Sequence, residues 1–236
     1  MAQDIYDPAF VASLFDRCST RYRRWSAVSS FGFVWLWRKQ CVDRLVGQSN
    51  VARIHEGTLS PRIPKVTQVI DLMAGTGEVW PHVLGAFPRA QITAIDISPA
   101  MHAEAITKLH GTRAHKINHL TANALDDDLP ANTADLLVAT FGLKTFNKEQ
   151  QTVLAGQIAR ILMPGGSFSL IEASDPIGWP LRPFYRAYLH GALPLIERLF
   201  LKAAQDFSMI STYTRNFENC RHMESALRDA GLKVTY

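Results

Sequence analysis

The sequence predicts an α/β protein built on a Rossmann-like doubly wound, mostly parallel sheet with helices on both faces. An N-terminal helical cap precedes the sheet, and a helical insertion follows its fifth strand. Three observations predict this class. From residue 66 onward, short apolar runs alternate with stretches of helical spacing, which is the pattern of βαβ units. The first apolar run ends in a glycine-rich turn, and residues 8–47, which precede the alternation, have helical periodicity throughout.

Composition excludes several classes of protein. The 236 residues are 47% hydrophobic and 19% charged, which is typical of a folded domain and not of a disordered chain. Three widely spaced cysteines without a CxxC pair predict no disulfide framework, no metal site and a cytoplasmic location. The net charge of +4 comes without a long basic run, so nucleic acid is not an expected partner. No apolar stretch is long enough to span a bilayer, which leaves a soluble protein or one in peripheral contact with a membrane.

The elements follow in order along the chain. We predict a helical cap over residues 1–50 and the α/β domain over residues 51–236, joined by a connector rich in Gly, Ser and Pro at residues 48–65. Residues 175–207 interrupt the alternation with four prolines and several aromatics, and are predicted to be a lid-like insertion. Strands are expected at residues 66–72, 91–95, 119–122, 134–140 and 167–172, with another beginning at 232–236. Helices are expected at residues 78–86, 99–109, 148–162 and 223–230.

The strongest single feature is the segment from Val69 to Gly77, in which a buried strand runs into a turn that opens a helix. Gly75 and Gly77 allow a ligand to approach the backbone, and the N-terminus of the helix offers N–H groups to an anion. The third glycine of the dinucleotide-binding pattern is missing. A lone Gly-x-Gly pair also fits a plain turn between a strand and a helix.

Two further residues follow neighbouring strands. Asp96 ends the second strand about 20 residues after the glycine turn, where a carboxylate accepts hydrogen bonds from ribose hydroxyls in sheets of this type. Asn123 begins the loop after the third strand, where its amide can bond to an adenine. Because such sheets bind ligands beyond the carboxyl ends of their strands, the three elements together predict adenosine binding.

At this point the sequence resembles the ubiquinone/menaquinone biosynthesis C-methyltransferase family, a branch of the class I methyltransferases. The resemblance covers nearly the whole chain. It is carried at the N-terminus by Leu14-Phe15-Asp16, Thr20-Arg21-Tyr22 and Trp37-Arg38-Lys39. The cofactor motifs that carry it are Asp71-Leu72-Met73-Ala74-Gly75-Thr76-Gly77 and Ala94-Ile95-Asp96-Ile97-Ser98-Pro99-Ala100-Met101. Later segments are Ala139-Thr140-Phe141-Gly142-Leu143, Leu162-Met163-Pro164-Gly165-Gly166 and the more specific Leu193-Pro194-Leu195-Ile196.

The resemblance implies S-adenosylmethionine as the cofactor. Asp71 and Gly75 would lie by its methionine part, Asp96 on its ribose, Met101 against the adenine, and Asn123 at the adenine edge where the family usually has Asp. The full set of expected cofactor-binding residues is Asp71, Ala74, Gly75, Gly77, Asp96, Ile97, Met101, Asn123, Ala124 and Thr140. A second departure follows Leu143, because Lys144-Thr145 stands where the family has Arg-Asn, and lysine lacks the planar, multi-donor geometry of arginine.

Three polar residues are candidates for the acceptor site. Lys144 could stabilise a developing phenolate, and Tyr22 and His190 could take or relay a proton. Each could instead have a surface or packing role. The aromatics at residues 31–37 and 179–185 would suit an apolar acceptor, and Arg21, Arg23 and Arg24 would suit a diphosphate or form a solvated face.

The leading hypothesis is C-methylation of a prenylated quinol or a related phenol. A second is methylation of another small molecule, such as an isoprenoid diphosphate, an indole or a polyketide, which the Lys144-Thr145 pair favours. A third is a cofactor-binding protein without methyl transfer. A small apolar or prenylated substrate is therefore the expected partner, and a homodimer is left open.

Overall fold

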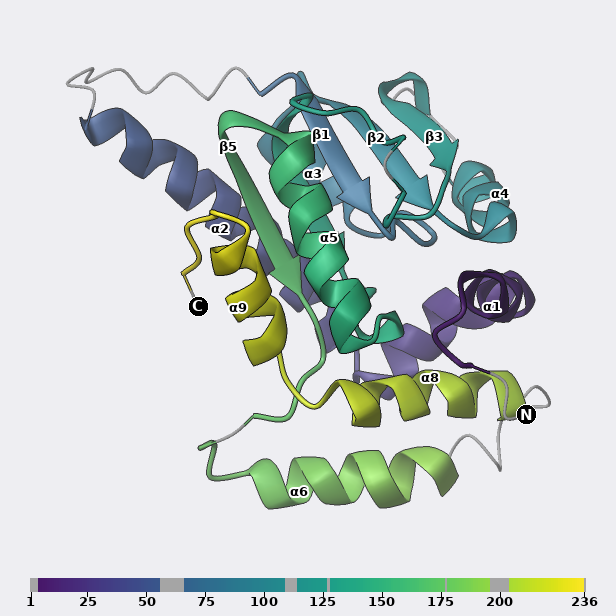
Figure 1. Cartoon of the computed structure of the whole chain (residues 1–236). Helices are drawn as coiled ribbons and strands as arrows, with labels where there is room; N and C mark the ends of the chain where they lie inside the picture. Colours follow the sequence, from purple (N-terminus) through teal and green to yellow (C-terminus); the bar gives the residue numbers. More distant parts are fainter. Residues whose placement is uncertain are drawn as a thin grey trace.

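The computed structural model describes residues 4–55, 66–108, 114–126, 128–176, 178–195 and 204–235. Its centre is a five-stranded sheet in the order β3-β2-β1-β4-β5, and every pair of neighbouring strands is parallel. The order turns back beside β1, as in a doubly wound sheet (Figure 1). This confirms the predicted fold class. The strands are β1 (Gln68–Leu72), β2 (Gln91–Asp96), β3 (Ile117–Thr121), β4 (Ala134–Thr140) and β5 (Leu162–Ile171).

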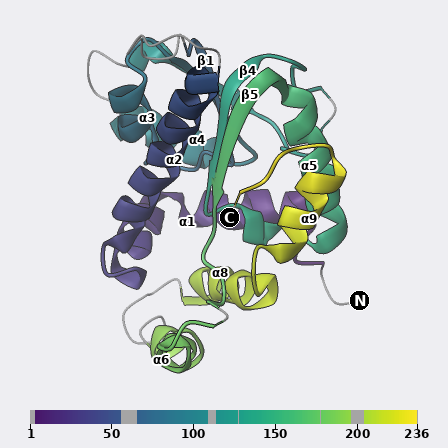
Figure 2. The same ribbon diagram turned by 90° about the vertical axis from the view of Figure 1, so that its left-hand side faces the viewer.

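Helices cover both faces of the sheet, because a parallel sheet buries both of its faces. Figure 2 shows α2 and α3 on one face of the sheet, and α5 and α9 on the other. Buried aliphatic side chains of the strands form one core cluster with α2 and α3 and a second with α5 and α9. The bounds of these helices and of the one after β2 are α2 (Phe33–His55), α3 (Trp80–Ala86), α4 (Pro99–Lys108), α5 (Lys148–Ile161) and α9 (Arg221–Asp229).

The predicted helical stretch at residues 8–47 is two helices, α1 (Pro8–Ser29) and α2, joined by a sharp turn. Phe31 and Gly32 both have positive φ in this turn, at 51° and 79°, and such a conformation ends a helix. Helix α2 continues to His55, beyond the predicted cap boundary at residue 50, and the rest of the expected connector, residues 56–65, lies outside the described residues. The division into a cap and a domain stays a prediction.

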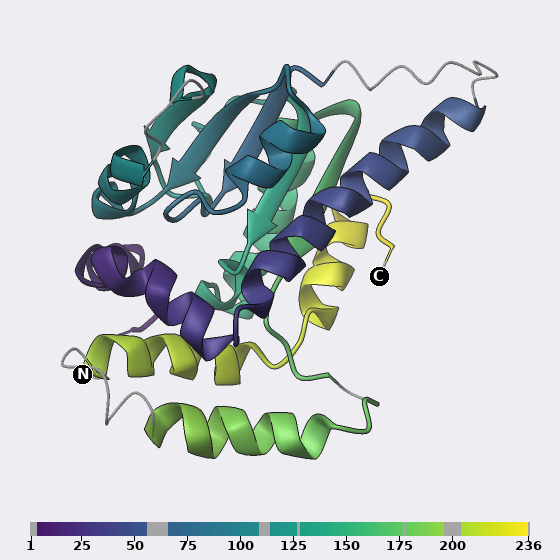
Figure 3. The same cartoon turned by 180° about the vertical axis from the view of Figure 1, so that it is seen from behind.

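Helix α1 lies across the carboxyl ends of the strands and packs against the segment that follows β5 (Figure 3). That segment contains α6 (Arg182–Ala187), a π-helical turn η3 (Tyr188–Ala192) and α8 (Ala204–Phe217). Leu14 and Trp25 of α1 pack with Phe207 and Tyr213 of α8 in a third core cluster. The predicted insertion at residues 175–207 is helical at residues 182–195 and 204–207; residues 177 and 196–203, including Ile196, lie outside the described residues.

The structure also differs from the sequence prediction at β5 and after α9, and other element ends differ by one or two residues. Strand β5 begins at Leu162, directly after α5, so the segment Met163-Pro164-Gly165-Gly166 lies within the strand instead of forming a separate turn. Residues 232–235 form no strand, although one was expected to begin there. Leu232 and Val234 pack against the core cluster of α5 and α9, and this packing accounts for their apolar character.

Candidate functional site

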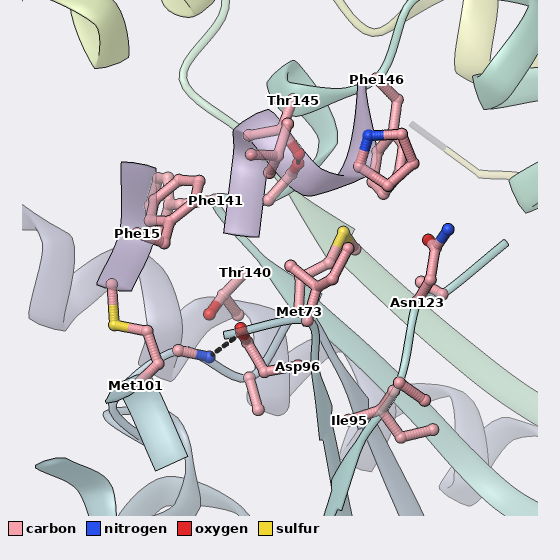
Figure 4. Close-up of a pocket in the computed structure, with 18 of the residues that line it drawn as sticks. Phe15, Met73, Ile95, Asp96, Met101, Asn123, Thr140, Phe141, Thr145 and Phe146 are labelled. Atoms are coloured by element: carbon pink, nitrogen blue, oxygen red, sulfur yellow. Dashed lines mark hydrogen bonds between the residues drawn. The ribbon is translucent and has the colours of Figure 1, made fainter. Parts of the chain in front are cut away.

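A pocket opens at the carboxyl ends of β1, β2 and β4, beneath α1. The loops after these strands form its floor, and α1 contributes Val11, Phe15 and Tyr22 to its cover. Figure 4 shows Asp96 and Met101 at one side of the pocket, Thr145 and Phe146 at another, and Phe141 and Met73 between them. Ligands of doubly wound sheets bind at this edge, so the pocket lies where the sequence predicted a site.

The glycine turn forms the floor of the pocket. Met73 and Gly75 have positive φ, at 57° and 56°, and Gly75 has open space where a side chain would point. Met73, Ala74 and Gly75 line the pocket. Gly77 does not line it: its φ is +75° and the indole ring of Trp80 occupies the space where a side chain would lie.

Asp96 organises the turn from the neighbouring strand. One of its carboxylate oxygens accepts a hydrogen bond from the backbone N–H of Gly75 at 2.7 Å, and the other accepts one from Ser98 at 2.9 Å. Burial raises the pKa of Asp96, and these two backbone donors act in the opposite direction. The hydroxyl of Ser98 donates in turn to Asp16 of α1, at 2.6 Å, so the covering helix is tied to this loop.

Four of the predicted cofactor-binding residues follow β2 or β3. Ile97, Met101, Asn123 and Ala124 all line the pocket. The side-chain oxygen of Asn123 accepts a hydrogen bond from the backbone N–H of Leu125 at 3.1 Å, which fixes the orientation of the amide. A carbonyl oxygen has two lone pairs, so this oxygen can still accept from a ligand.

Aromatic side chains also line the pocket. They are Phe15, Phe141 and Phe146, and the polar side chains of Tyr22 and Thr145 line it too. Burial raises the pKa of Tyr22 far above its usual range, so its hydroxyl stays protonated and can donate a hydrogen bond. Thr140 also lines the pocket.

Lys144 points away from the pocket. Its ammonium group donates to Glu172 Oε1 at 2.9 Å and to the carbonyl of Phe141 at 2.7 Å, and both side chains are buried. Removal of one partner of such a pair leaves an uncompensated buried charge. Lys144 therefore holds the end of β5 against the loop after β4, while the adjacent Thr145 lines the pocket.

His190 lies in the exposed π-helical turn and does not line the pocket. Arg21, Arg23 and Arg24 are also exposed and outside it. The aromatic segments at residues 31–37 and 179–185 do not line it either. Of the residues predicted for the acceptor, Tyr22 alone lies at the pocket.

Asp71 lies buried beneath the turn and does not line the pocket. Its Oδ2 accepts a hydrogen bond from Trp80 Nε1 at 2.8 Å, whereas its Oδ1 has no hydrogen-bond partner within the described part of the chain. Burial raises the pKa of Asp71 to about 8. The neutral carboxyl group therefore predominates at neutral pH.

Four polar residues of the pocket were not predicted from the sequence: Tyr6, Arg38, Glu78 and Gln150. Arg38 had a usable signal. It occupies the same helical stripe as Val34, Cys41 and Leu45, all of which are buried against the sheet. An arginine on the buried stripe of a helix indicates a specific partner.

Comparisons with known proteins agree with this geometry. The model of the ubiE/COQ5 methyltransferase family matches residues 3–236. A demethylmenaquinone methyltransferase of Listeria welshimeri is 25% identical over 225 residues, which cover 94% of this chain and 86% of the relative. The ubiquinone/menaquinone biosynthesis C-methyltransferase of Syntrophotalea carbinolica is 30% identical over 191 residues, or 81% of this chain and 73% of the relative. Among solved structures, an S-adenosylmethionine-dependent methyltransferase from Thermotoga maritima has a TM-score of 0.58 and 15% identity. The match covers 94% of this chain and 81% of the solved chain, and this likeness shows the fold.

Proposed function

Because this chain belongs to the ubiE/COQ5 methyltransferase family, we propose that it transfers a methyl group from S-adenosylmethionine to a ring carbon of a prenylated quinol. The chain is an S-adenosylmethionine-dependent methyltransferase, and S-adenosylmethionine is its cofactor. The observation that supports the acceptor class is the pocket itself. One continuous pocket is lined both by Asp96 and by the aromatic rings of Phe15 and Phe146.

The residues of the pocket fit this cofactor. Asp96 is the expected partner of the ribose, Asn123 and Ala124 of the adenine, and Ile97 and Met101 supply apolar surface beside the base. The open backbone at Gly75 leaves room for the methionine part. Within the described part of the chain, no group of His, Cys, Asp and Glu side chains is arranged to hold a metal ion.

S-adenosylmethionine supplies a methyl group on a sulfonium, and the residues of the chain position the acceptor for in-line attack on that methyl group. Phe15, Phe141 and Phe146 surround an aromatic ring and exclude water from it. The protonated hydroxyl of Tyr22 donates a hydrogen bond to an oxygen of the acceptor and stabilises negative charge that develops there. Thr145 occupies the place where the resemblance implies asparagine, and its hydroxyl donates to the carbonyl of Gly142 at 2.8 Å.

A second candidate function is methylation of a different apolar acceptor, such as an indole or a polyketide. The orientation of Lys144 favours it, because an ammonium group paired with Glu172 does not take the place of an arginine directed at a quinol. An isoprenoid diphosphate is less well supported, since Arg21, Arg23 and Arg24 lie outside the pocket.

Mass spectrometry of small molecules distinguishes these acceptors. The purified protein is incubated with S-adenosylmethionine and, separately, with a demethylated prenylated quinol, an indole, a polyketide phenol and farnesyl diphosphate. We expect one added methyl group on the quinol, at a ring carbon. We also expect the Asp96→Ala variant to lose about 10- to 100-fold in activity, because a charge-assisted hydrogen bond to the ribose is lost. Methylation of another acceptor, with the quinol unchanged, would reject the quinol assignment and retain methyl transfer.

We also propose that an apolar and cationic face of the molecule rests on an anionic lipid surface, where a prenylated acceptor would be found. This face consists of Val28, Phe31 and Phe33 at the turn between α1 and α2, together with Phe184 of α6, and all four are exposed. The rings of Phe31 and Tyr188 lie 5.4 Å apart, so the turn and the segment after α6 are contiguous. Arg24 and Arg21 lie one and two turns before Val28 on the same face of α1, and their positive charge complements anionic lipid headgroups. No described helix is long and apolar enough to cross a membrane.

A further inference from the structure

We propose that Arg38 of α2 binds the α-carboxylate of the methionine part of S-adenosylmethionine. The inference rests on the proposed use of this cofactor and assigns a charged partner that the sequence motifs do not supply. It makes the second helix of the chain part of the cofactor site.

The side chain of Arg38 is buried and incompletely paired. Arg38 is 4% exposed, yet its guanidinium lines the pocket. Its Nη2 lies 3.3 Å from Glu78 Oε2, and its Nε has no hydrogen-bond partner among the described residues. Burial of a guanidinium is costly unless its donors are satisfied, and a group with five donors requires more than one distant carboxylate oxygen. The missing partner is therefore an acceptor inside the pocket.

The position of Arg38 corresponds to the methionine end of the cofactor. Asn123 and Asp96, the expected partners of the adenine and the ribose, stand at the ends of β3 and β2. Both strands lie on the same side of β1 in the strand order. Arg38 lies on the other side of β1, where its guanidinium carbon is 5.2 Å from the centre of the Phe141 ring, in the loop after β4. A ligand whose nucleoside lies over β2 and β3 extends across the open backbone of Gly75 toward this guanidinium.

The charged side chains of Arg38 and Glu78 together complement a carboxylate that belongs to an amino acid. A guanidinium binds a carboxylate through two parallel N–H donors, and the pairing is strong when both groups are removed from water. Glu78 lies beside Arg38, and its other oxygen, Oε1, accepts from the Thr76 hydroxyl at 2.5 Å. A positive and a negative side chain next to each other complement the α-carboxylate and the α-ammonium group of one amino acid. Glu78 also holds the guanidinium at the wall of the pocket before the ligand binds.

Calorimetry with two ligands tests the proposal without any need for turnover. S-adenosylhomocysteine carries the amino-acid end, whereas 5′-methylthioadenosine has the same nucleoside and lacks it. We expect Arg38→Ala to raise the Kd for S-adenosylhomocysteine by about 10- to 100-fold, the usual loss for a charged hydrogen-bonded pair, and to leave the Kd for 5′-methylthioadenosine within about twofold. Lys39→Ala is the matched control, because Lys39 lies on the same helix, is exposed and pairs with Asp43.

Arg38→Lys and Arg38→Met, with melting curves, separate binding from folding. Lysine retains the charge without the planar fork, so an intermediate Kd for S-adenosylhomocysteine is expected, and methionine retains the volume of the buried stem. Equal weakening of both ligands would overturn the proposal and assign Arg38 to folding. An unchanged Kd for both, with a reduced kcat/KM for the acceptor, would overturn it and assign Arg38 to the acceptor. If the unmodified protein bound neither ligand, the proposed cofactor itself would fail.

Discussion

At the scale of the residue, Asp71 combines deep burial with one hydrogen bond from Trp80 Nε1. Its pKa is raised from 3.8 to about 8, first of all because burial disfavours the ionised form. A carboxyl group with a raised pKa in the folded state stabilises the fold fully below its unfolded pKa. That contribution is lost as the pH rises through the folded pKa. Asp71 thus makes the folded protein less stable toward alkaline pH.

The Asp71→Asn variant tests this assignment. Its amide oxygen still accepts from Trp80 Nε1, but the group no longer ionises. We expect the Tm of the unmodified protein to fall between about pH 5 and about pH 9, and the Tm of the variant to fall less. Part of the decrease in Tm with rising pH should remain in the variant, because the pKa of Asp96 is also raised. If thermal unfolding gave the same dependence of Tm on pH for the variant and the unmodified protein, Asp71 would be already ionised in the folded state.

The residue scale also shows what the sequence could predict of the site. Asp96 and Asn123 could be predicted because they stand at or after the ends of β2 and β3, whereas Met101 was implied by the family resemblance; all three line the pocket. Lys144 was placed at the acceptor because the sequence does not show which way a side chain points, and the buried Glu172 that pairs with it is 28 residues away. Arg38 was missed for the same reason, since its partner Glu78 lies 40 residues away in the turn before α3.

At the scale of the element, the glycine turn depends on its two glycines in different ways. Both have positive φ, which costs a residue with a side chain about 1 kcal/mol. Gly75 has open space around it, whereas a side chain at Gly77 would overlap the indole ring of Trp80, which bonds to Asp71. A side chain is therefore disfavoured at Gly75 by the backbone conformation alone, and at Gly77 also by the packing of Trp80.

Two alanine variants test this difference. We expect Gly75→Ala to lower the free energy of unfolding by about 1 kcal/mol and Gly77→Ala to lower it by about 3 kcal/mol or more, because overpacking adds to the cost of the positive φ. Urea denaturation of the two variants measures both values. The interpretation of the Trp80 contact would be wrong if the two variants were equally stable.

Element boundaries were predictable where local chemistry marks them. Helix α5 was predicted at residues 148–162 from its spacing and the Pro-Gly-Gly signal after it, and it spans Lys148–Ile161; a capping box of Asn147 and Gln150 marks its start. The break between α1 and α2 was missed. Phe31 takes a left-handed conformation there inside an aromatic-rich run that otherwise has helical spacing. In α2, the buried stripe runs through Val34 and Cys41, and Trp35 is exposed.

At the scale of the whole molecule, exposed aromatics at the α1–α2 turn and on α6 predict binding to membranes. Phe31 is 73% exposed and Phe184 is 74% exposed, and both are in the face that we propose rests on lipid. We expect the protein to sediment with vesicles that contain phosphatidylglycerol, and to do so less at high salt. The double variant Phe31→Ser, Phe184→Ser should lower the partition coefficient for these vesicles by about tenfold.

A matched control is available on the opposite part of the structure. Ile106 of α4 is also exposed, at 55%, and is absent from this face, so Ile106→Ser should bind vesicles like the unmodified protein. Equal loss in both variants, or equal binding to neutral vesicles at low and high salt, would contradict the assignment of this face. The face joins the α1–α2 turn to the segment after α6, where the Tyr188 hydroxyl donates to the carbonyl of Ser29, 159 residues away, so periodicity within one helix could not reveal it.

The hydrogen bonds from Ser98 and Ala100 to Asp16 have a kinetic consequence. The same helix that covers the pocket also anchors the loop that organises Asp96. Because the helix that accepts these bonds also covers the pocket, we expect the rate at which a bound nucleoside leaves to depend on them.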